Sequence, residues 1–130
     1  MKDFPCLPEG AKPDVLHPMC PSRQVLAHLT SRWGALILVA LSGKTLRFSQ
    51  LRRALGNVSE RMLAQTLQGL EADRMILRVA HDVVPPHVDY SLTEIGEEAA
   101  GLVKGLAAWV ERRLPEILAG REVRLEPDQV

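Results

Sequence analysis

A polar stripe on one predicted helix carries side chains suited to reading base edges in DNA. Arg61, Gln65 and Gln68 follow one another at spacings of four and three residues, so they share one face of a helix predicted over residues 59–73. In the major groove, arginine can donate two hydrogen bonds to guanine and glutamine can pair with adenine. The alternative is an ordinary solvated helix face, because both residue types are common there.

Basic side chains also flank the preceding predicted helix, residues 48–55. In a helix–turn–helix motif this helix crosses the DNA backbone, so arginines beside it can contact phosphates, although each could equally be a plain surface charge. A predicted hairpin tip at residues 83–87 adds groups that could reach phosphate or the minor groove, whereas His81 is expected to be an ordinary exposed histidine. The candidate DNA contacts are Arg47, Ser49, Arg52, Arg53, Ser59, Arg61, Gln65, Gln68, Arg78 and His87.

Cys20 has a position that can make a thiol reactive. Pro21 is favoured at the first position of a helix, which leaves Cys20 near the N-cap. The positive end of the helix dipole favours the thiolate, the species that reacts. A buried, inert cysteine is the alternative. The second cysteine, Cys6, lies in a proline-rich segment and is expected to be exposed, and two cysteines are too few for a secreted disulfide scaffold.

The sequence carries no motif for catalysis or cofactor binding. We find no glycine-rich phosphate loop, nucleophile elbow or HExxH pattern. Four residues could bind a metal, but they do not have the spacing of a known metal site. They are Cys6, His17, Cys20 and His28. We therefore expect no enzymatic activity, no cofactor and no metal.

The order of the predicted elements indicates how these side chains are positioned. A tight link at residues 56–58 separates the two helices, and strand-like runs follow at residues 76–84 and 87–92. Helix, turn, helix and two-stranded hairpin is the order of a winged helix–turn–helix. We expect a mainly α fold with a small β-hairpin wing.

The flanking segments suggest a dimer. Residues 33–41 are apolar all round and predict a buried central helix. A long helix predicted over residues 93–114, which Pro115 should kink or stop, has two apolar stripes, and the core needs only one. We expect the terminal helices to join two subunits, with the C-terminal contacts at Leu102, Leu106, Trp109, Val110 and Leu114.

Composition restricts the classes of partner. Only 4% of residues are aromatic, which argues against a base-stacking binder of single strands. The chain has no net charge, but residues 20–92 carry +4 and residues 93–130 carry −3, so a locally basic face can meet phosphates. No apolar run reaches ~20 residues, and no signal-peptide core is present, so we expect a cytoplasmic protein without a membrane partner.

Residues 20–109 contain a series of short motifs in a fixed order, of which the last is the most specific. The motifs are Cys20-Pro21, Arg32-Trp33, Leu41 with Gly43, the run at residues 47–51, Ser59, Met62-Leu63, Leu67, the run at residues 70–73, and residues 84–93 followed by Gly96. In these motifs the chain resembles the HxlR-type transcriptional regulators, a winged-helix family related to the MarR-like group. This chain departs from the pattern at His87, where a permanently charged base is usual, and at Ser31, where glycine is common.

The resemblance implies a bacterial homodimer that binds a palindromic operator in double-stranded DNA. In many members the cysteine that matches Cys20 senses electrophiles, quinones or oxidants, which makes Cys20, with Cys6 as a candidate partner, the redox-sensing site. The alternatives are a ligand-responsive regulator without thiol sensing and a winged helix used for protein contacts. The expected organisation is an extended arm (1–19), the winged helix–turn–helix domain (20–114) with its dimerisation helix (93–114), and a short tail (115–130).

Overall fold

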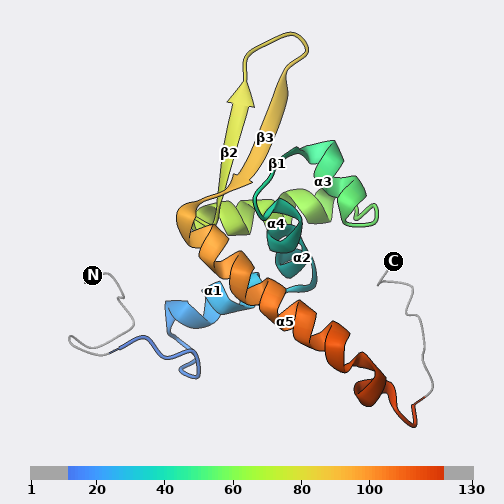
Figure 1. The fold of residues 1–130 in the computed structure, drawn as a ribbon. Helices are drawn as coiled ribbons and strands as arrows, with labels where there is room; N and C mark the ends of the chain where they lie inside the picture. The colour runs from blue at the N-terminus through green and yellow to red at the C-terminus, as the bar shows by residue number, and fades with distance from the viewer. Residues whose placement is uncertain (1–11, 122–130) are drawn as a thin grey trace.

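A computed structural model describes residues 12–121 of the 130-residue chain. Cys6 and most of the expected arm and tail lie outside the described residues. The elements follow the predicted order (Figure 1): α1 (Pro21–Thr30), α2 (Arg32–Leu41), β1 (Thr45–Arg47), α3 (Phe48–Ala54), α4 (Glu60–Ala72), β2 (Ile76–His81), β3 (His87–Leu92) and α5 (Glu94–Leu118). The fold is therefore the predicted one, mainly α with a β-hairpin wing.

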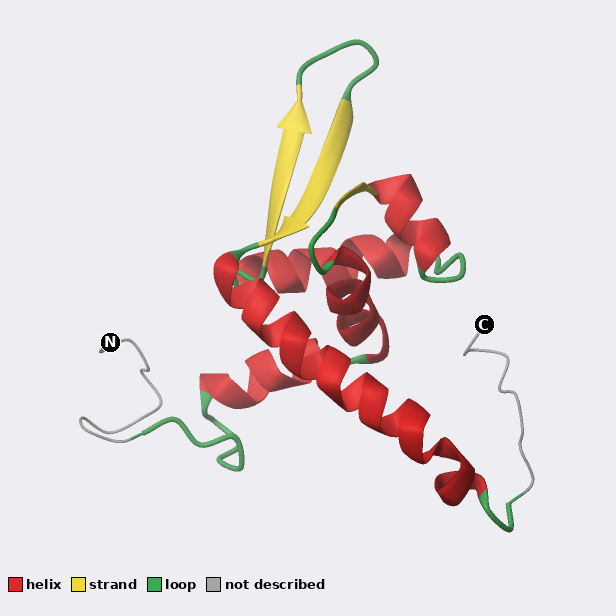
Figure 2. Ribbon diagram, in the orientation of Figure 1, coloured by secondary structure: helices red, strands yellow, loops and turns green. Residues whose placement is uncertain are grey.

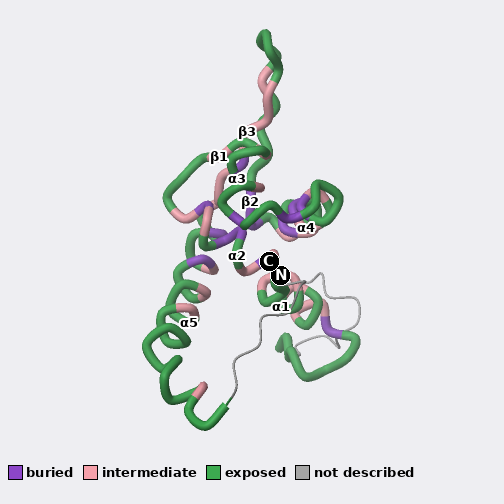
Figure 3. Tube along the Cα trace, turned by 90° about the vertical axis from the view of Figure 1, so that its right-hand side faces the viewer, coloured by how far each residue is buried: buried purple, intermediate pink, exposed green. Residues whose placement is uncertain are grey.

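The core lies where α2, α3 and α4 meet the base of the sheet. Leu63, Leu67 and Leu70, spaced four and three residues apart on α4, form an apolar stripe on one face of the helix, and all three are buried. Figure 3 shows the buried positions gathered at this junction, with the far ends of α5 and the wing exposed. The largest fully buried side chains are Ile37, Leu38, Leu41, Leu51, Leu63, Leu67 and Leu70.

The sheet has three antiparallel strands in the order β1-β3-β2. The β2–β3 hairpin, residues 76–92, projects from the helical body and forms the wing (Figure 2). Its base is anchored by Ile76 and Tyr90, which are buried, and its tip is exposed. The register places His81 opposite His87, and Asp89 opposite Val79 on one side and Arg47 on the other.

The link between α3 and α4 is held by backbone and side-chain hydrogen bonds. Gly56 and Asn57 both have positive φ angles, which turn the chain sharply. The Asn57 N–H donates to the Arg52 carbonyl at 2.9 Å, and the Arg52 Nε donates to the Val58 carbonyl at 2.6 Å. The Ser59 hydroxyl caps α4 by accepting from the Met62 N–H. These bonds fix α4 relative to α3.

Helix α2 is less buried than its composition indicates. Ile37, Leu38 and Leu41 face the core, but Leu36 and Val39 remain exposed. The predicted central helix is therefore buried on its core face, whereas its other apolar face is only partly covered by α5 within residues 12–121. Gly34 allows the close approach of α1, because a Cβ there would collide with the His28 carbonyl oxygen.

Helix α5 is buried at its start and packs along α2 on one side, while most of its other residues are exposed. Gly96 and Ala100 are its buried residues, and Gly96 lies so close to the Met75 carbonyl that a Cβ could not fit. The helix continues through Pro115 to Leu118, so of the two expected outcomes, a kink or a stop, the stop is wrong. Pro115 lies near the end of the helix. Its missing N–H removes one hydrogen bond there, and the preceding turns stay intact.

Within the described part of the chain, no single helix is long and apolar enough to cross a membrane. Helices α1 and α2, which meet at a bend of 70°, reach the required length and composition only when they are counted together.

Candidate nucleic-acid interface

The polar stripe on α4 faces away from the core. Its three side chains, Arg61, Gln65 and Gln68, are exposed, and they lie on the side of the helix opposite the buried leucines. Within residues 12–121 no hydrogen bond or ion pair ties these side chains to the rest of the fold. Arg61, Gln65 and Gln68 thus form one free surface of donors and acceptors, which is the arrangement that base reading needs.

Shallow hollows flank the stripe on both sides. One lies between α4 and the wing and brings Gln68 near Arg78 and Tyr90. The other lies between α4 and the end of α1 and brings Gln65 near His28. Of the predicted site residues, the structure thus brings Gln68 and Arg78 together at the foot of the wing.

The arginines near α3 divide into two kinds. Arg53 and Arg47 are exposed, and Ser49 is exposed between them. The guanidinium of the partly exposed Arg52 instead contacts the chain itself, where it donates to the Val58 carbonyl and lies 3.9 Å from the Glu60 carboxylate. The first role of Arg52 is therefore to hold the turn before α4, and Ser59 likewise serves as the α4 cap.

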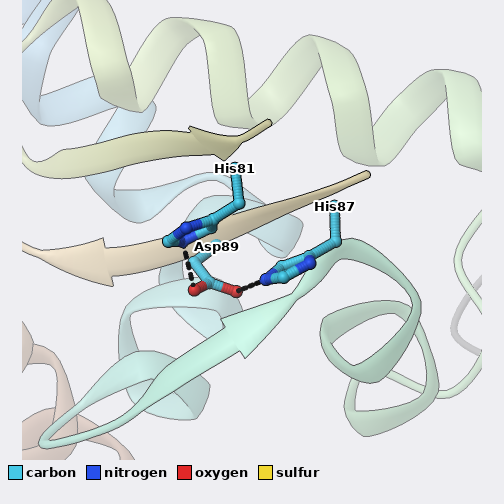
Figure 4. Close-up of side chains that lie close together, drawn as sticks. All are labelled: His81, His87 and Asp89. Carbon is cyan, nitrogen blue, oxygen red and sulfur yellow. Dashed lines mark hydrogen bonds and ion pairs between the residues drawn. The ribbon is translucent and has the colours of Figure 1, made fainter. Parts of the chain in front are cut away.

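The wing histidines are not free side chains. We expected His81 to be an ordinary exposed histidine, and this is wrong. Its Nε2 lies 2.8 Å from the Asp89 Oδ2, and its ring stacks on that of His87 with centroids 4.6 Å apart. Figure 4 shows the two rings side by side with the carboxylate between their nitrogens. His87 therefore lies in a cluster on the body of the wing, set back from its tip.

Cys20 occupies the N-cap of α1, as the position of Pro21 predicts. The side chain is only 3% exposed, and its Sγ lies 3.0 Å from the Ser22 hydroxyl and accepts a hydrogen bond from the Asp14 N–H. The hydrogen bond from Ser22 lowers the pKa of the Cys20 thiol, burial partly opposes this, and the Asp14 N–H lowers it further. Cys20 thus combines a favoured thiolate with a covered position, two properties that the sequence offered as alternatives.

Sequence reasoning missed the link between α1 and α4. His28 Nδ1, in the last turn of α1, lies 2.5 Å from Asp73 Oδ2, at the C-cap of α4. The helix that begins at Cys20 is thereby tied to the helix that carries the polar stripe. The two residues are 45 positions apart, and no local pattern connects them.

An apolar groove runs between α2 and α5. It is lined by Ala35, Leu36, Val39, Val103, Leu106, Ala107, Val110 and Glu111. All five residues predicted to join two subunits are exposed, with Leu102 at 79% the most accessible, and two of them, Leu106 and Val110, line this groove. We did not predict from the sequence that α2 would line this groove. Its unbroken apolar composition was the signal, because a helix that packs on the core with one face needs no apolar residues on its other face.

Comparison with known proteins gives a consistent assignment. The family described as HxlR-like helix-turn-helix matches residues 28–117. The chain is 61% identical over 105 residues to the HTH-type transcriptional regulator YtfH of Escherichia coli strain K12, which covers 81% of this chain and 83% of that one.

Solved structures show the same fold. The transcriptional regulator YtfH from Salmonella typhimurium matches with a TM-score of 0.78 and 56% identity, over 83% of this chain and 96% of that one. The redox regulator HypR in its reduced form matches with a TM-score of 0.69 and 29% identity, over 76% of this chain and 98% of that one. The chain therefore belongs to the HxlR-like helix-turn-helix family of transcriptional regulators.

Proposed function

We propose that this protein is a homodimeric, sequence-specific DNA-binding regulator that places α4 in the major groove and responds to electrophiles or oxidants through Cys20. The observation that carries the DNA-binding part is the free stripe of Arg61, Gln65 and Gln68, opposite a row of fully buried leucines. A helix whose core face is fixed and whose polar face is unoccupied can enter a groove without rearrangement.

Phosphate contacts complete the proposed interface. The exposed Arg53, Arg47 and Ser49 border α3, and Arg78 lies beside the stripe on the wing. Contacts of this kind set the position of the protein on the duplex and make binding depend steeply on salt. Arg52 and Ser59 contribute indirectly, since they hold the turn and the start of α4.

The subunit contact follows from the uncovered apolar surface. Leu102, Leu106, Trp109, Val110 and Leu114 of α5 are exposed, and Leu36 and Val39 extend this surface onto α2. A second copy of the chain can bury both sets, and two copies related by a two-fold axis suit a palindromic operator. We place such a regulator in the cytoplasm, where bacterial chromosomal DNA lies.

Sensing would begin with the covered thiolate of Cys20. Its sulfur would add to a ring carbon of a quinone, forming an S–C bond while the ring takes up the electron pair and a proton and becomes a hydroquinone. The adduct cannot fit where Cys20 is now 3% exposed, so the segment around Asp14 and Ser22 must move. The contact between His28 and Asp73 would then carry the displacement of α1 to α4. The similar fold of HypR, named a redox regulator, supports this part.

Selection of bound sequences from random duplex DNA tests the whole proposal. We expect reduced protein to enrich a palindrome with half-sites roughly 10 bp apart, and quinone-treated protein to bind it with altered affinity. Cys20→Ser should keep the enrichment and lose the response. Failure to enrich any sequence would favour a winged helix used for protein contacts. Unchanged affinity with Cys20 fully modified would leave a regulator in which this cysteine is structural.

A further inference from the structure

One face of the wing gathers side chains that are typical ligands of transition metals. His81 ends β2, His87 begins β3, and the register sets them directly opposite one another. Asp89 lies two positions after His87, and alternate residues of a strand point to the same face. The three side chains therefore project together, as Figure 4 shows.

The distances between their ligand atoms suit a single ion. One atom from each residue lies within 4.8 Å of the other two. The His81 Nε2 is 2.8 Å from one carboxylate oxygen of Asp89, and the His87 Nε2 is 3.9 Å from the other. Ligands that hold one tetrahedral ion at bonds of about 2.0–2.2 Å lie roughly 3.3 Å apart. The distance from Asp89 to His81 must lengthen and that to His87 must shorten, and the two histidine nitrogens, which lie within 4.8 Å of one another, must reach the same separation. Rotations of the side chains can supply these changes.

We propose that His81, His87 and Asp89 form a binding site for a divalent transition-metal ion, of which Zn²⁺ is the representative. Imidazole nitrogens favour Zn²⁺, Co²⁺, Ni²⁺ or Cu²⁺, whereas Mg²⁺ and Ca²⁺ prefer sites built from oxygen alone. Three protein ligands leave the remaining position of a tetrahedral ion to water or to another group.

The surroundings leave the site accessible and the ligands available. The side chains of His81, His87 and Asp89 are 38%, 23% and 27% exposed, so an ion can enter from solvent. The His87 Nε2 points toward the carboxylate but lies beyond hydrogen-bond distance of it, so an ion between them would displace no bond of His87. Arg47, opposite Asp89 on β1, forms no ion pair with it in the described residues.

The stacking of the two rings keeps their ligand nitrogens close to one another. The ring centroids of His81 and His87 are 4.6 Å apart. A metal ion binds imidazole in its neutral form through a nitrogen lone pair. The ion would join β2 to β3 next to the exposed tip of the wing.

Titration of the full-length chain with ZnCl₂ and CoCl₂ tests the proposal. Cys6→Ser and Cys20→Ser together provide a background in which no thiolate can bind the ion. The chain has four histidines, and their ring signals can be followed by NMR. We expect one ion per chain, with shifts at His81 and His87 and none at His17 or His28, and no response to MgCl₂. Shifts confined to His17 or His28, or no saturable shift, would overturn the site.

Single substitutions separate the ligands from general effects of the wing. His81→Ala, His87→Ala and Asp89→Asn should each weaken Zn²⁺ binding about tenfold or more, whereas His17→Ala should leave it unchanged. Circular dichroism shows whether each variant is folded. Because Asp89→Asn preserves the shape of the side chain, it tests the coordination even if either histidine variant is unfolded. Binding as tight as in the unsubstituted background for all three ligand variants would exclude the proposed coordination.

Discussion

His28 of α1 and Asp73 at the C-cap of α4 form a direct contact, with 2.5 Å between Nδ1 and Oδ2. Cys20 lies at the start of α1, and the polar stripe lies along α4. The contact therefore connects the proposed sensing thiol to the proposed base-reading helix through one helix and one pair of side chains. The imidazole also lies against Gly69 on α4, where a larger side chain would meet it.

Loss of this contact should affect both stability and response. The two side chains are 35% and 15% exposed, so we expect His28→Ala to lower the free energy of unfolding by about 1 kcal/mol, less than a fully buried charged hydrogen bond provides. Urea denaturation measures this, with His17→Ala as the control. The same variant should reduce the change in DNA affinity that a quinone causes. A full response in His28→Ala would show that the displacement travels by another route.

Arg61→Ala should weaken binding to the best operator by ~1–3 kcal/mol and relax the preference at one base position. The reason is that its exposed guanidinium has no partner in the described residues and is free to read a base. Fluorescence anisotropy with operator and scrambled duplexes measures both effects. Arg112→Ala, which removes the same charge from α5, is the matched control. Equal losses in the two variants would indicate that only overall charge matters.

Arg52 and Arg53 are neighbours that should give opposite results. Arg52→Ala removes the hydrogen bond to the Val58 carbonyl, so we expect a loss of about 1 kcal/mol in stability and weaker DNA binding as a consequence. Arg53→Ala should leave stability unchanged, weaken all DNA sequences nearly equally and reduce the slope of affinity against salt. Thermal unfolding combined with salt titration distinguishes them, and an interchange of the two results would contradict the assigned roles.

The apolar face across α5 and α2 should hold two subunits together. Leu106→Ser places a hydroxyl in the groove that Val39 and Val110 also line, so we expect it to shift the protein from dimer toward monomer at micromolar concentration. Light scattering measures the mass. Leu77→Ser, an equivalent change at an exposed leucine of the wing, should leave the mass unchanged. A wild-type monomer under the same conditions would rule out the proposed dimer.

The lowered pKa of Cys20 predicts how its reactivity depends on pH. Because the Ser22 hydroxyl stabilises the thiolate, the pH at which alkylation by iodoacetamide reaches half its maximal rate should lie below that of an ordinary thiol. Ser22→Ala removes the largest cause, so the midpoint should move to higher pH. Cys6→Ser serves as the background, which leaves Cys20 as the one cysteine. An unchanged midpoint in Ser22→Ala would contradict this explanation.

The same shift has a defined sign for stability. The thiolate of Cys20 is favoured in the folded state, so its contribution is present above the pKa of the unfolded chain and is lost as the pH falls through the lower pKa of the folded chain. The difference between wild type and Ser22→Ala in the free energy of unfolding should therefore be larger at alkaline pH than at acidic pH. Urea denaturation across this range measures it.

The parts of the fold that could be predicted from sequence have local causes. The spacing of Leu63, Leu67 and Leu70 defines which face of α4 is buried, and the opposite face then follows from helix geometry alone. The cap at Cys20 likewise depends on its neighbour Pro21. Both of these predictions, the buried face of α4 and the N-cap of α1, depend only on residues close together in the sequence.

The parts that could not be predicted depend on register and on distant packing. The sequence suggested that the first wing strand reaches Val84, whereas β2 ends at His81, and only this shorter strand sets His81 opposite His87. A shift of one residue would have turned these side chains to opposite faces. The exposure of Leu36 was equally hidden, because composition does not tell which apolar face a neighbouring helix will cover.

Helix α5 has the mechanical character of a lever. Its two buried residues, Gly96 and Ala100, lie at its start, against the junction of α4 and β2, and the remainder runs along α2 and then out to Leu118. Those last eighteen residues span roughly 27 Å at about 1.5 Å per residue, so a rotation of about 10° at the anchor would swing the far end by about 5 Å. In a dimer joined through α5, a rotation of this size would leave the core of each subunit intact. It would change the separation of the two α4 helices by a distance comparable to one base-pair step. Repression or release of an operator would then require no change of fold, only a change of angle at Gly96.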